Sequence, residues 1–398
     1  MRRSLRFLLK VLATMVVALL VAGVIYEQVG RRRDKQRFTQ IGRSVDIGGR
    51  SLNIHCSGNG SPTVVLESAV GYRWLPIQRE VARFTRACWY DRAGYGWSDP
   101  GPSPRTSGAM AADLHALLRA AAVPPPYVLV GASGAGFVVR VFAGRHLNEV
   151  AGVVLLDAAH EDQRKYEPRH DLGWAHRAPV PVRSALFTAA PVAGQVGLVR
   201  LVLRATAAAA ARRPSPQGMS PDEARYFYFL SRLPPSFVTE ADEGRHWDAS
   251  AEEARKANGL GDRPLIVLTA GRLEVPSDPA DVAEARAFHQ SKVYDLQPKL
   301  ARLSSRGRQI IVNNSGHGIQ FEAPDVVIGA IREVVTESRG DGQEKTNLGK
   351  VPGRASRGSP AKEHAQHAVC QMSRPADAAL PFVRDEAVPE ERAHRNGG

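Results

Sequence analysis

The sequence predicts an α/β fold in which a mostly parallel sheet of about eight strands is wrapped by helices and carries a helical cap. Short runs rich in β-branched and aromatic residues alternate with helical stretches over residues 44–337. Several of these runs lack polar alternation, which is typical of central parallel strands covered on both faces. Residues 159–262 contain no convincing strand, and we interpret them as an inserted cap.

The predicted strands are short, and turn residues separate those in the N-terminal part of the chain. They are Ser44–Ile47, Leu52–Cys56, Thr63–Leu66, Ala87–Tyr90, Tyr127–Val130, Gly152–Leu156, Leu265–Leu268 and Gln309–Val312. Helices are expected over 108–122, 134–147, 279–303 and 324–337. The core therefore comprises residues 39–158 and 263–338, and the cap comprises residues 159–262. Residues 339–398 are rich in Gly, Pro, Arg and Glu, a composition that predicts a disordered tail.

An apolar run precedes the predicted core. Phe7 to Tyr26 is interrupted only by Lys10 and Thr14, and about 20 such residues match the thickness of a bilayer when helical. Residues 1–38 carry a net charge of +7 out of +13 for the whole chain. Because nucleic-acid binders place their basic excess on the folded domain, this charge favours a membrane surface and excludes a nucleic-acid partner. We expect residues 1–38 to form a single-pass anchor and a basic juxtamembrane segment. The polar linker that begins in this segment covers residues 27–43.

Two alternatives to this anchor concern its processing and its orientation. A cleaved signal peptide would need a small-x-small site, and Val21-Ala22-Gly23 is a poor version of one. The basic residues after the run outnumber those before it, and taken alone they place the following domain in the cytoplasm.

The strongest chemical signal is the segment that follows the fifth predicted strand. Gly131-Ala132-Ser133-Gly134-Ala135-Gly136 carries Ser133 on a sharp turn between a buried strand and a helix. Such a strained turn needs small neighbours, and Gly131 and Ala135 provide them. The N–H of Gly134, at the start of the helix, can face an oxyanion. The spacing fits neither a dinucleotide fingerprint nor a phosphate-binding P-loop.

Four segments together resemble the α/β-hydrolase superfamily over about residues 44–337. Besides the nucleophile elbow at Gly131–Gly136, they are Asp91–Asp99, Gly152–Asp157, and Asn314–His317 followed by Pro324. The resemblance implies a nucleophilic Ser133 and a general base, His317, in a loop after the last strand. A serine hydroxyl is a weak nucleophile until such a base takes its proton. His160 could line the substrate pocket.

The acid that orients the histidine has more than one candidate. The family usually takes it from the loop after the seventh strand, where Glu274 lies, with Asp278 and Asp281 nearby. Some members use an acid after the sixth strand, which here is Asp157. We prefer Asp157 because it ends an apolar strand at the sheet edge where sites in open α/β sheets lie, and Glu274 remains the alternative.

The resemblance also bears on the oxyanion site and on two cysteines. The second oxyanion donor is expected from Val70 or Ala69, although this chain lacks the His-Gly that the family often shows there. Cys56 and Cys88 lie on strands that are antiparallel neighbours in the family, so we predict a Cys56–Cys88 disulfide. A structural disulfide implies an oxidising compartment, which favours an extracytoplasmic catalytic domain over the orientation argued from the basic residues.

These residues predict a membrane-anchored serine hydrolase that cleaves a carboxylic ester or a similar acyl substrate through an acyl-enzyme. No cofactor or metal is expected, and the anchor and the apolar cap suggest a lipophilic small-molecule substrate. The alternatives are other chemistry on the same fold, such as a perhydrolase or a carbon–carbon bond hydrolase, and a catalytically silent binding or scaffold protein. Family members that open epoxides carry an acid at the elbow, and this chain carries Ser133 there.

Overall fold

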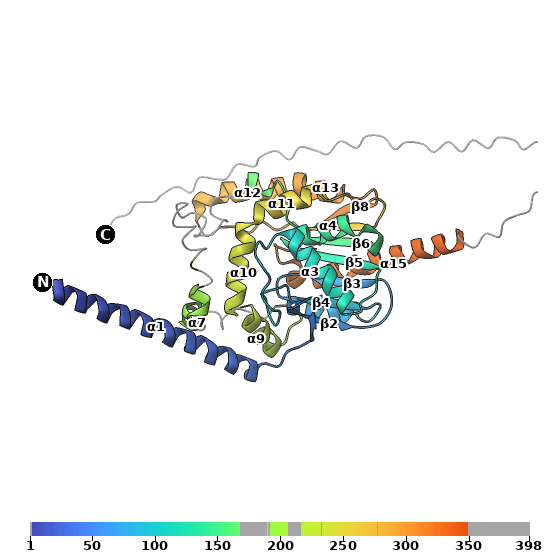
Figure 1. The fold of residues 1–398 in the computed structure, drawn as a ribbon. Helices are drawn as coiled ribbons and strands as arrows, with labels where there is room; N and C mark the ends of the chain where they lie inside the picture. The colour runs from blue at the N-terminus through green and yellow to red at the C-terminus, as the bar shows by residue number, and fades with distance from the viewer. Residues whose placement is uncertain are drawn as a thin grey trace, which may run out of the picture. The chain divides into compact units, whose positions relative to one another are not determined.

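An eight-stranded sheet forms the centre of the molecule in a computed structural model that describes residues 2–167, 189, 192–205, 216–231, 233–276 and 278–348 (Figure 1). The spatial order of the strands is β1-β2-β4-β3-β5-β6-β7-β8. Only β2 pairs antiparallel to its neighbours, and the other pairs are parallel. The strands are β1 (Arg43–Asp46), β2 (Ser51–Ser57), β3 (Thr63–Glu67), β4 (Ala87–Tyr90), β5 (Tyr127–Ala132), β6 (Val150–Leu156), β7 (Leu265–Ala270) and β8 (Gly307–Val312). The predicted fold class is confirmed.

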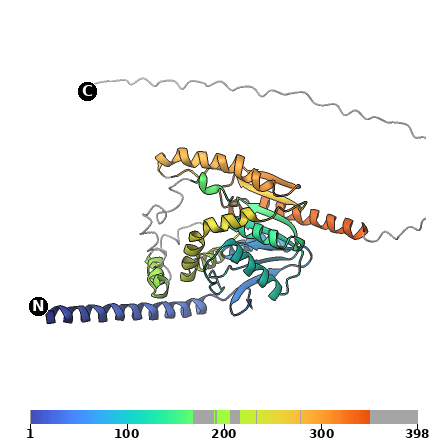
Figure 2. The ribbon, with the colours of Figure 1, turned by 45° about the horizontal axis from the view of Figure 1, so that its top comes forward.

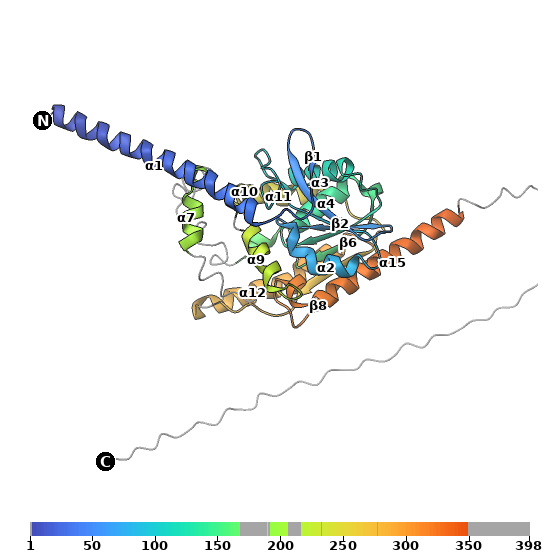
Figure 3. The ribbon, with the colours of Figure 1, turned by 90° about the horizontal axis from the view of Figure 1, so that it is seen from below.

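Alternate residues of the central strands belong to two separate apolar layers, one on each face of the sheet. Leu129 and Val153 face one layer, whereas Val128 and Val154 face the other. Both sets are buried because helices cover both faces, which explains why these strands show no polar alternation. Helices α3 (Ser107–Ala120) and α4 (Ala135–Arg145) cover one face, and α2 (Leu75–Val81) and α15 (Pro324–Leu348) cover the other (Figure 3).

Several helices lie in the sequence between β6 and β7. They are α7 (Leu198–Ala205), α9 (Pro221–Leu230), α10 (Pro234–Arg245) and α11 (Trp247–Lys256). Ser220 begins α9 with a reciprocal capping box to Glu223, and Pro221 stands at the first helical position. The helices α10 and α11, yellow in Figure 2, lie beside the sheet, and α11 packs on α3 and α4. Part of the expected cap, residues 168–188 and 206–215, lies outside the described residues.

The region between β7 and β8 is less regular than the predicted helix over 279–303. A 3-10 turn (Pro279–Asp281) leads into α12 (Val282–Ser291), a π-helical turn (Lys292–Leu296) and α13 (Gln297–Ala301). Single π-turns inside helices are frequent at functional sites. This one displays Lys292, whose contact is described below.

Two terminal predictions need correction. Helix α1 (Arg2–Arg37) continues through most of the expected linker, since no Pro interrupts residues 27–37. Helix α15 extends to Leu348, ten residues into the segment expected to be disordered from Arg339 onward; the first Pro after that point is Pro352. Residues 349–398 lie outside the described residues.

One helix of the described chain is long and apolar enough to cross a membrane. It comprises Leu5–Asp34 and contains an 18-residue window with a mean hydropathy of 2.6, which is not buried by the rest of the protein. Arg200 of α7 contacts this helix near its C-terminal end, through ion pairs to Glu27 at 2.8 Å and Asp34 at 2.5 Å.

Candidate active site

Ser133 occupies a strained turn at the carboxyl end of β5. Its φ is +55°, a left-handed conformation that a serine seldom adopts. The turn fits because its neighbours are small. A Cβ on Gly131 would lie 2.9 Å from the Val139 side chain, and one on Gly136 would lie 2.6 Å from the Ala158 Cβ. The small residues therefore allow β5 to pass directly through the turn at Ser133 into helix α4, with no intervening loop.

The elbow is tied to the end of the neighbouring strand β6. The N–H of Ser133 donates to the Leu156 carbonyl at 3.0 Å, and the Ser133 carbonyl accepts from the N–H of Ala159 at 2.9 Å. Asp157 lies between these two anchor points and also has a positive φ, +42°. Ser133 and Asp157 therefore lie on adjacent turns at the same sheet edge.

The Asp157 carboxylate is fully buried and contacts His317. Its Oδ2 lies 2.6 Å from Nδ1 of His317, and its Oδ1 accepts from the N–H of Ala270 at 3.1 Å. The Asp157 N–H donates to Leu268 at 2.7 Å, so β7 fixes both the backbone and the carboxylate. The structure thus brings together Asp157 and His317, which are 160 residues apart in the sequence.

Lys292 is a second side chain that contacts the Asp157 carboxylate. Its Nζ lies 2.5 Å from the same Oδ2. Burial opposes ionisation of Asp157, but the hydrogen bond with His317 and the charge of Lys292 outweigh it and hold the pKa of Asp157 below its ordinary value. Sequence reasoning missed Lys292, because no motif marks a lysine between β7 and β8 as a neighbour of an aspartate after β6.

Glu274 contacts the same loop at a different point. Its Oε1 accepts from the backbone N–H of His317 at 2.9 Å, and it crowds Gly316, where a Cβ would lie 2.6 Å from that oxygen. The imidazole Nδ1 is taken by Asp157 instead. Of the two acids weighed from the sequence, Asp157 has the geometry of an imidazole-orienting group and Glu274 that of a loop-holding group.

The loop after β3 leaves the sheet at the same edge as the elbow, because β3 and β5 are parallel neighbours with Glu67 opposite Gly131. Gly71 donates its N–H to Asp91 Oδ1 at 2.9 Å, so that donor is occupied. Asp91 also accepts from Asn53 and Trp97, and burial raises its pKa to about 6 despite these bonds. Within the described part of the chain, the N–H groups of Val70 and Gly134 donate to no other residue.

His160 is buried and held within its own loop. Its Nδ1 accepts from the N–H of Asp162 at 3.0 Å. The carboxylates of Glu161 and Asp162 lie 3.9 Å and 4.0 Å from the same nitrogen. Burial lowers the pKa of His160, with the charges of those acids acting in the opposite direction. No described contact joins His160 to Ser133 or His317, and a role for His160 in the substrate pocket stays a prediction.

Trp247, at the start of α11, lies against the elbow. A Cβ on Gly134 would meet the Trp247 ring at 3.4 Å, and that ring packs on Phe137 with centroids 5.3 Å apart. The guanidinium of Arg164 covers the ring at 5.6 Å. Trp247 therefore brings an apolar surface from the segment between β6 and β7 to the vicinity of Ser133. The sequence did not predict this contact, because Trp247 lies far from Ser133 along the chain.

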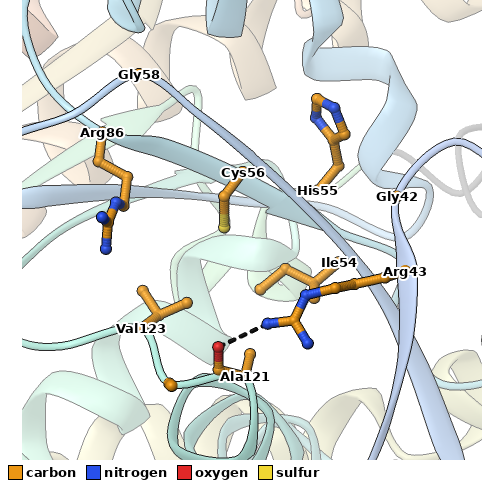
Figure 4. Close-up of a pocket in the computed structure, with 10 residues that line it drawn as sticks. Gly42, Arg43, Ile54, His55, Cys56, Gly58, Arg86, Ala121 and Val123 are labelled. Carbon is orange, nitrogen blue, oxygen red and sulfur yellow. Dashed lines mark hydrogen bonds between the residues drawn. The ribbon is translucent and has the colours of Figure 1, made fainter.

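The predicted pair Cys56–Cys88 forms a disulfide. The cysteines face each other in register on the antiparallel strands β2 and β4, with their Cα atoms 4.1 Å apart. The bond lies beside a cavity of about 490 Å³ lined by Arg43, His55 and Arg86, in which Arg43 donates to the Ala121 carbonyl at 2.6 Å (Figure 4). This cavity lies at the opposite end of the parallel strands from Ser133, since Arg86 precedes β4 and Val123 precedes β5.

One cluster of described residues has metal-ligating atoms within 4.8 Å of one another, namely His115, His146 and Glu149. The two imidazoles stack in parallel, with centroids 3.7 Å apart and planes 10° apart. Because the lone pairs of imidazole lie in the ring plane, stacked rings direct them side by side and not toward one ion. The cluster shares no residue with the elbow, Asp157 or His317.

A serine elbow, a histidine after the last strand and a paired aspartate on an eight-stranded sheet define the α/β-hydrolase class. The model of the alpha/beta hydrolase family matches residues 54–330. The chain belongs to this family, as its four sequence segments indicated.

Solved structures share the fold of this chain. A putative epoxide hydrolase from Pseudomonas aeruginosa has a TM-score of 0.54 at 18% identity, covering 75% of this chain and 96% of that one. A putative lipase from Acinetobacter baumannii has a TM-score of 0.51 at 14% identity, covering 79% and 97%. At these identities the likeness shows the fold alone.

Curated relatives match shorter stretches. The uncharacterized protein YqjL of Bacillus subtilis is 32% identical over 108 residues, which cover 26% of this chain and 43% of YqjL. An uncharacterized protein of Schizosaccharomyces pombe is 47% identical over 74 residues, covering 19% and 14%. The matches span less than half the length of these relatives.

Proposed function

We propose that the protein is a serine hydrolase that cleaves a carboxylic ester or a similar acyl substrate, with Ser133 as nucleophile, His317 as general base and Asp157 as the acid. The observation that carries this proposal is the 2.6 Å contact between His317 Nδ1 and Asp157 Oδ2. It occurs at the sheet edge where Ser133 bends away from β5. A buried carboxylate at Nδ1 fixes the tautomer that leaves Nε2 free to accept a proton.

The proposed reaction proceeds by acyl transfer. His317 removes the hydroxyl proton of Ser133 as Oγ attacks the ester carbonyl, and the N–H groups of Gly134 and Val70 stabilise the oxyanion. His317 then protonates the leaving alcohol, and a water activated by the same imidazole releases the acid product. These steps require no cofactor or metal.

The segment between β6 and β7 is the proposed cap. The ring of Trp247 at the elbow supports this role, because a cap residue there would contact the bound acyl group. Helix α10 reaches the core as well, since Asp242 accepts from the N–H of Arg105 at 2.9 Å.

We also propose that α1 anchors the protein in a membrane and that the substrate is lipophilic. The exposed apolar surface of Leu5–Asp34 supports the anchor. Helix α7 adds a second apolar surface near it, because Leu198, Leu201 and Val202 are exposed while Arg200 binds Glu27 of α1. The Cys56–Cys88 disulfide favours an extracytoplasmic catalytic domain.

A fluorophosphonate probe tests the nucleophile directly. The full chain in detergent should be labelled, and Ser133→Ala should abolish both the labelling and the hydrolysis of p-nitrophenyl esters. Ser338→Ala is the matched control, because its hydroxyl bonds only to carbonyls of Val334 and Ala151. Full labelling of Ser133→Ala would refute the assignment, and an unlabelled native protein would favour the silent scaffold.

A further inference from the structure

Arg73 is a cation placed between two loops of the proposed active site. It follows the oxyanion loop in a 3-10 turn (Gly71–Trp74), and its backbone N–H donates to the Val70 carbonyl at 3.3 Å. Its guanidinium lies 5.2 Å from the ring centroid of Phe321, four residues beyond His317. The side chain therefore bridges the loop that carries Val70 and the loop that carries His317.

The guanidinium of Arg73 has no anionic partner among the described residues. Its Nε is closed off from solvent and makes no hydrogen bond, and no described carboxylate forms an ion pair with it. Burial, reinforced by the positive charge of Arg92, lowers the pKa of Arg73 to about 10. The group thus remains charged at neutral pH in an unfavourable setting.

The carboxylates nearby are already engaged with Arg92. Its guanidinium forms ion pairs with Glu67 at 2.6 Å and with Glu243 at 2.8 Å. Arg92 therefore adds repulsion to Arg73, and neither of these two acids forms an ion pair with Arg73.

The arginines that are buried in the described part of the chain are paired. Arg105 binds Asp113 at 2.8 Å, and Arg140 binds Glu161 at 2.6 Å. Proteins keep buried charges paired because an uncompensated ion in a low-dielectric site is costly. Arg73 is half-buried with its Nε closed off from solvent, and it departs from this pattern between Val70 and Phe321, which lies four residues after His317. From this position we expect its anion to arrive with the substrate.

We propose that Arg73 is an anion-binding subsite, and that the ester substrate carries a carboxylate or phosphate group at one end. The planar guanidinium suits either group, because it offers paired N–H donors to two oxygens. Phe321 and Phe227, whose ring centroids are 6.1 Å apart, supply an apolar wall beside it. This inference rests on the proposed function and specifies its substrate class: an amphiphilic ester with an anionic head.

Paired esters of equal chain length test the subsite by kinetics. The full-length protein is assayed with p-nitrophenyl glutarate monoester, which carries a free carboxylate, and with neutral p-nitrophenyl valerate. We expect Arg73→Met to lower kcat/KM for the anionic ester by about 10- to 100-fold more than for the neutral ester, the size of a charge-assisted hydrogen bond. Arg73→Lys should restore part of this difference.

The control is Arg83→Met, which removes an exposed arginine that pairs only locally with Glu80. It should leave the ratio of the two kcat/KM values as in the native protein. If Arg73→Met and Arg83→Met give the same ratio, the subsite is refuted even though ester hydrolysis stands.

A binding measurement separates this inference from the proposed function. Ser133→Ala protein is heated with glutarate, with hexyl phosphate or with neutral glutaramide, and the unfolding temperature is recorded. We expect one or both anions to raise it, glutaramide not to, and Arg73→Met to remove the rise. The responding anion identifies the head group. No rise with either anion overturns the subsite. If the anions raise the unfolding temperature but the native protein hydrolyses neither ester, the subsite is supported and the proposed hydrolase function is refuted.

Discussion

Asp157 has two hydrogen-bonding partners at one oxygen, the imidazole of His317 and the ammonium group of Lys292. A third contact, from the N–H of Ala270, holds its other oxygen. These contacts let a buried carboxylate stay ionised, because each stabilises the charged form. The same charge would stabilise the imidazolium that forms on His317 during acyl transfer.

Exchanging the two candidate acids for their amides distinguishes their roles. Asp157→Asn should lower kcat for ester hydrolysis by about 10⁴-fold, since the amide favours the wrong histidine tautomer. Glu274→Gln should lower it by less than about 10-fold, because its carbonyl can still accept from the His317 N–H. A larger loss for Glu274→Gln than for Asp157→Asn would transfer the acid's role to Glu274.

Lys292 should influence the pH at which the protein unfolds in acid. With its pKa depressed in the folded state, Asp157 stabilises the fold above the ordinary aspartate pKa, and this contribution is lost as pH falls through the lowered value. Lys292→Met removes one cause of the depression, so the midpoint of acid unfolding, followed by circular dichroism, should move to higher pH. Lys299→Met, which removes a pairing with Asp295, is the control. An unchanged midpoint for Lys292→Met would contradict the coupling.

At the scale of elements, β2 and β4 depend on a covalent link as well as on their ladder. The disulfide joins residues 32 apart in the sequence, at facing positions of the antiparallel pair. A double Cys56→Ser, Cys88→Ser variant should be less stable by about 3–4 kcal/mol, the loop-closure estimate for that separation. Urea unfolding in detergent measures the difference.

Reduction provides an independent check of this estimate. The native protein in excess dithiothreitol should approach the stability of the double serine variant, which dithiothreitol should leave unchanged. Equal urea midpoints for the oxidised native protein and the variant would show that the bond adds nothing to the fold.

On the scale of the whole molecule, the anchor determines where the hydrolase domain acts. The native chain should remain in the membrane pellet after carbonate extraction. A Leu12→Arg, Val16→Arg variant should move to the soluble fraction, because each arginine at the centre of a span costs about 2.5–3.5 kcal/mol. Gln28→Arg, beyond the apolar run from Phe7 to Tyr26, is the control. A mature chain whose mass lacks residues 1–23 would show a cleaved signal peptide instead.

Much of the fold follows from local patterns in the sequence. Apolar runs such as Val153–Leu156 predict buried parallel strands, because strands covered on both faces cannot alternate. The small residues around Ser133 predict a strained elbow, because larger side chains would collide with Val139 and Ala158. Helix α2 was not predicted, since its seven residues are too few to show a periodic pattern.

The sequence by itself determined the family, the elbow and the histidine loop, since each is encoded by neighbouring residues. Tertiary structure alone decided that Asp157 and not Glu274 reaches the imidazole, that Lys292 shares its oxygen, and that Arg73 has no carboxylate partner among the described residues. The physical reason is separation along the chain. These contacts join residues of different loops, whose distances depend on how the strands assemble and on no local preference of the chain.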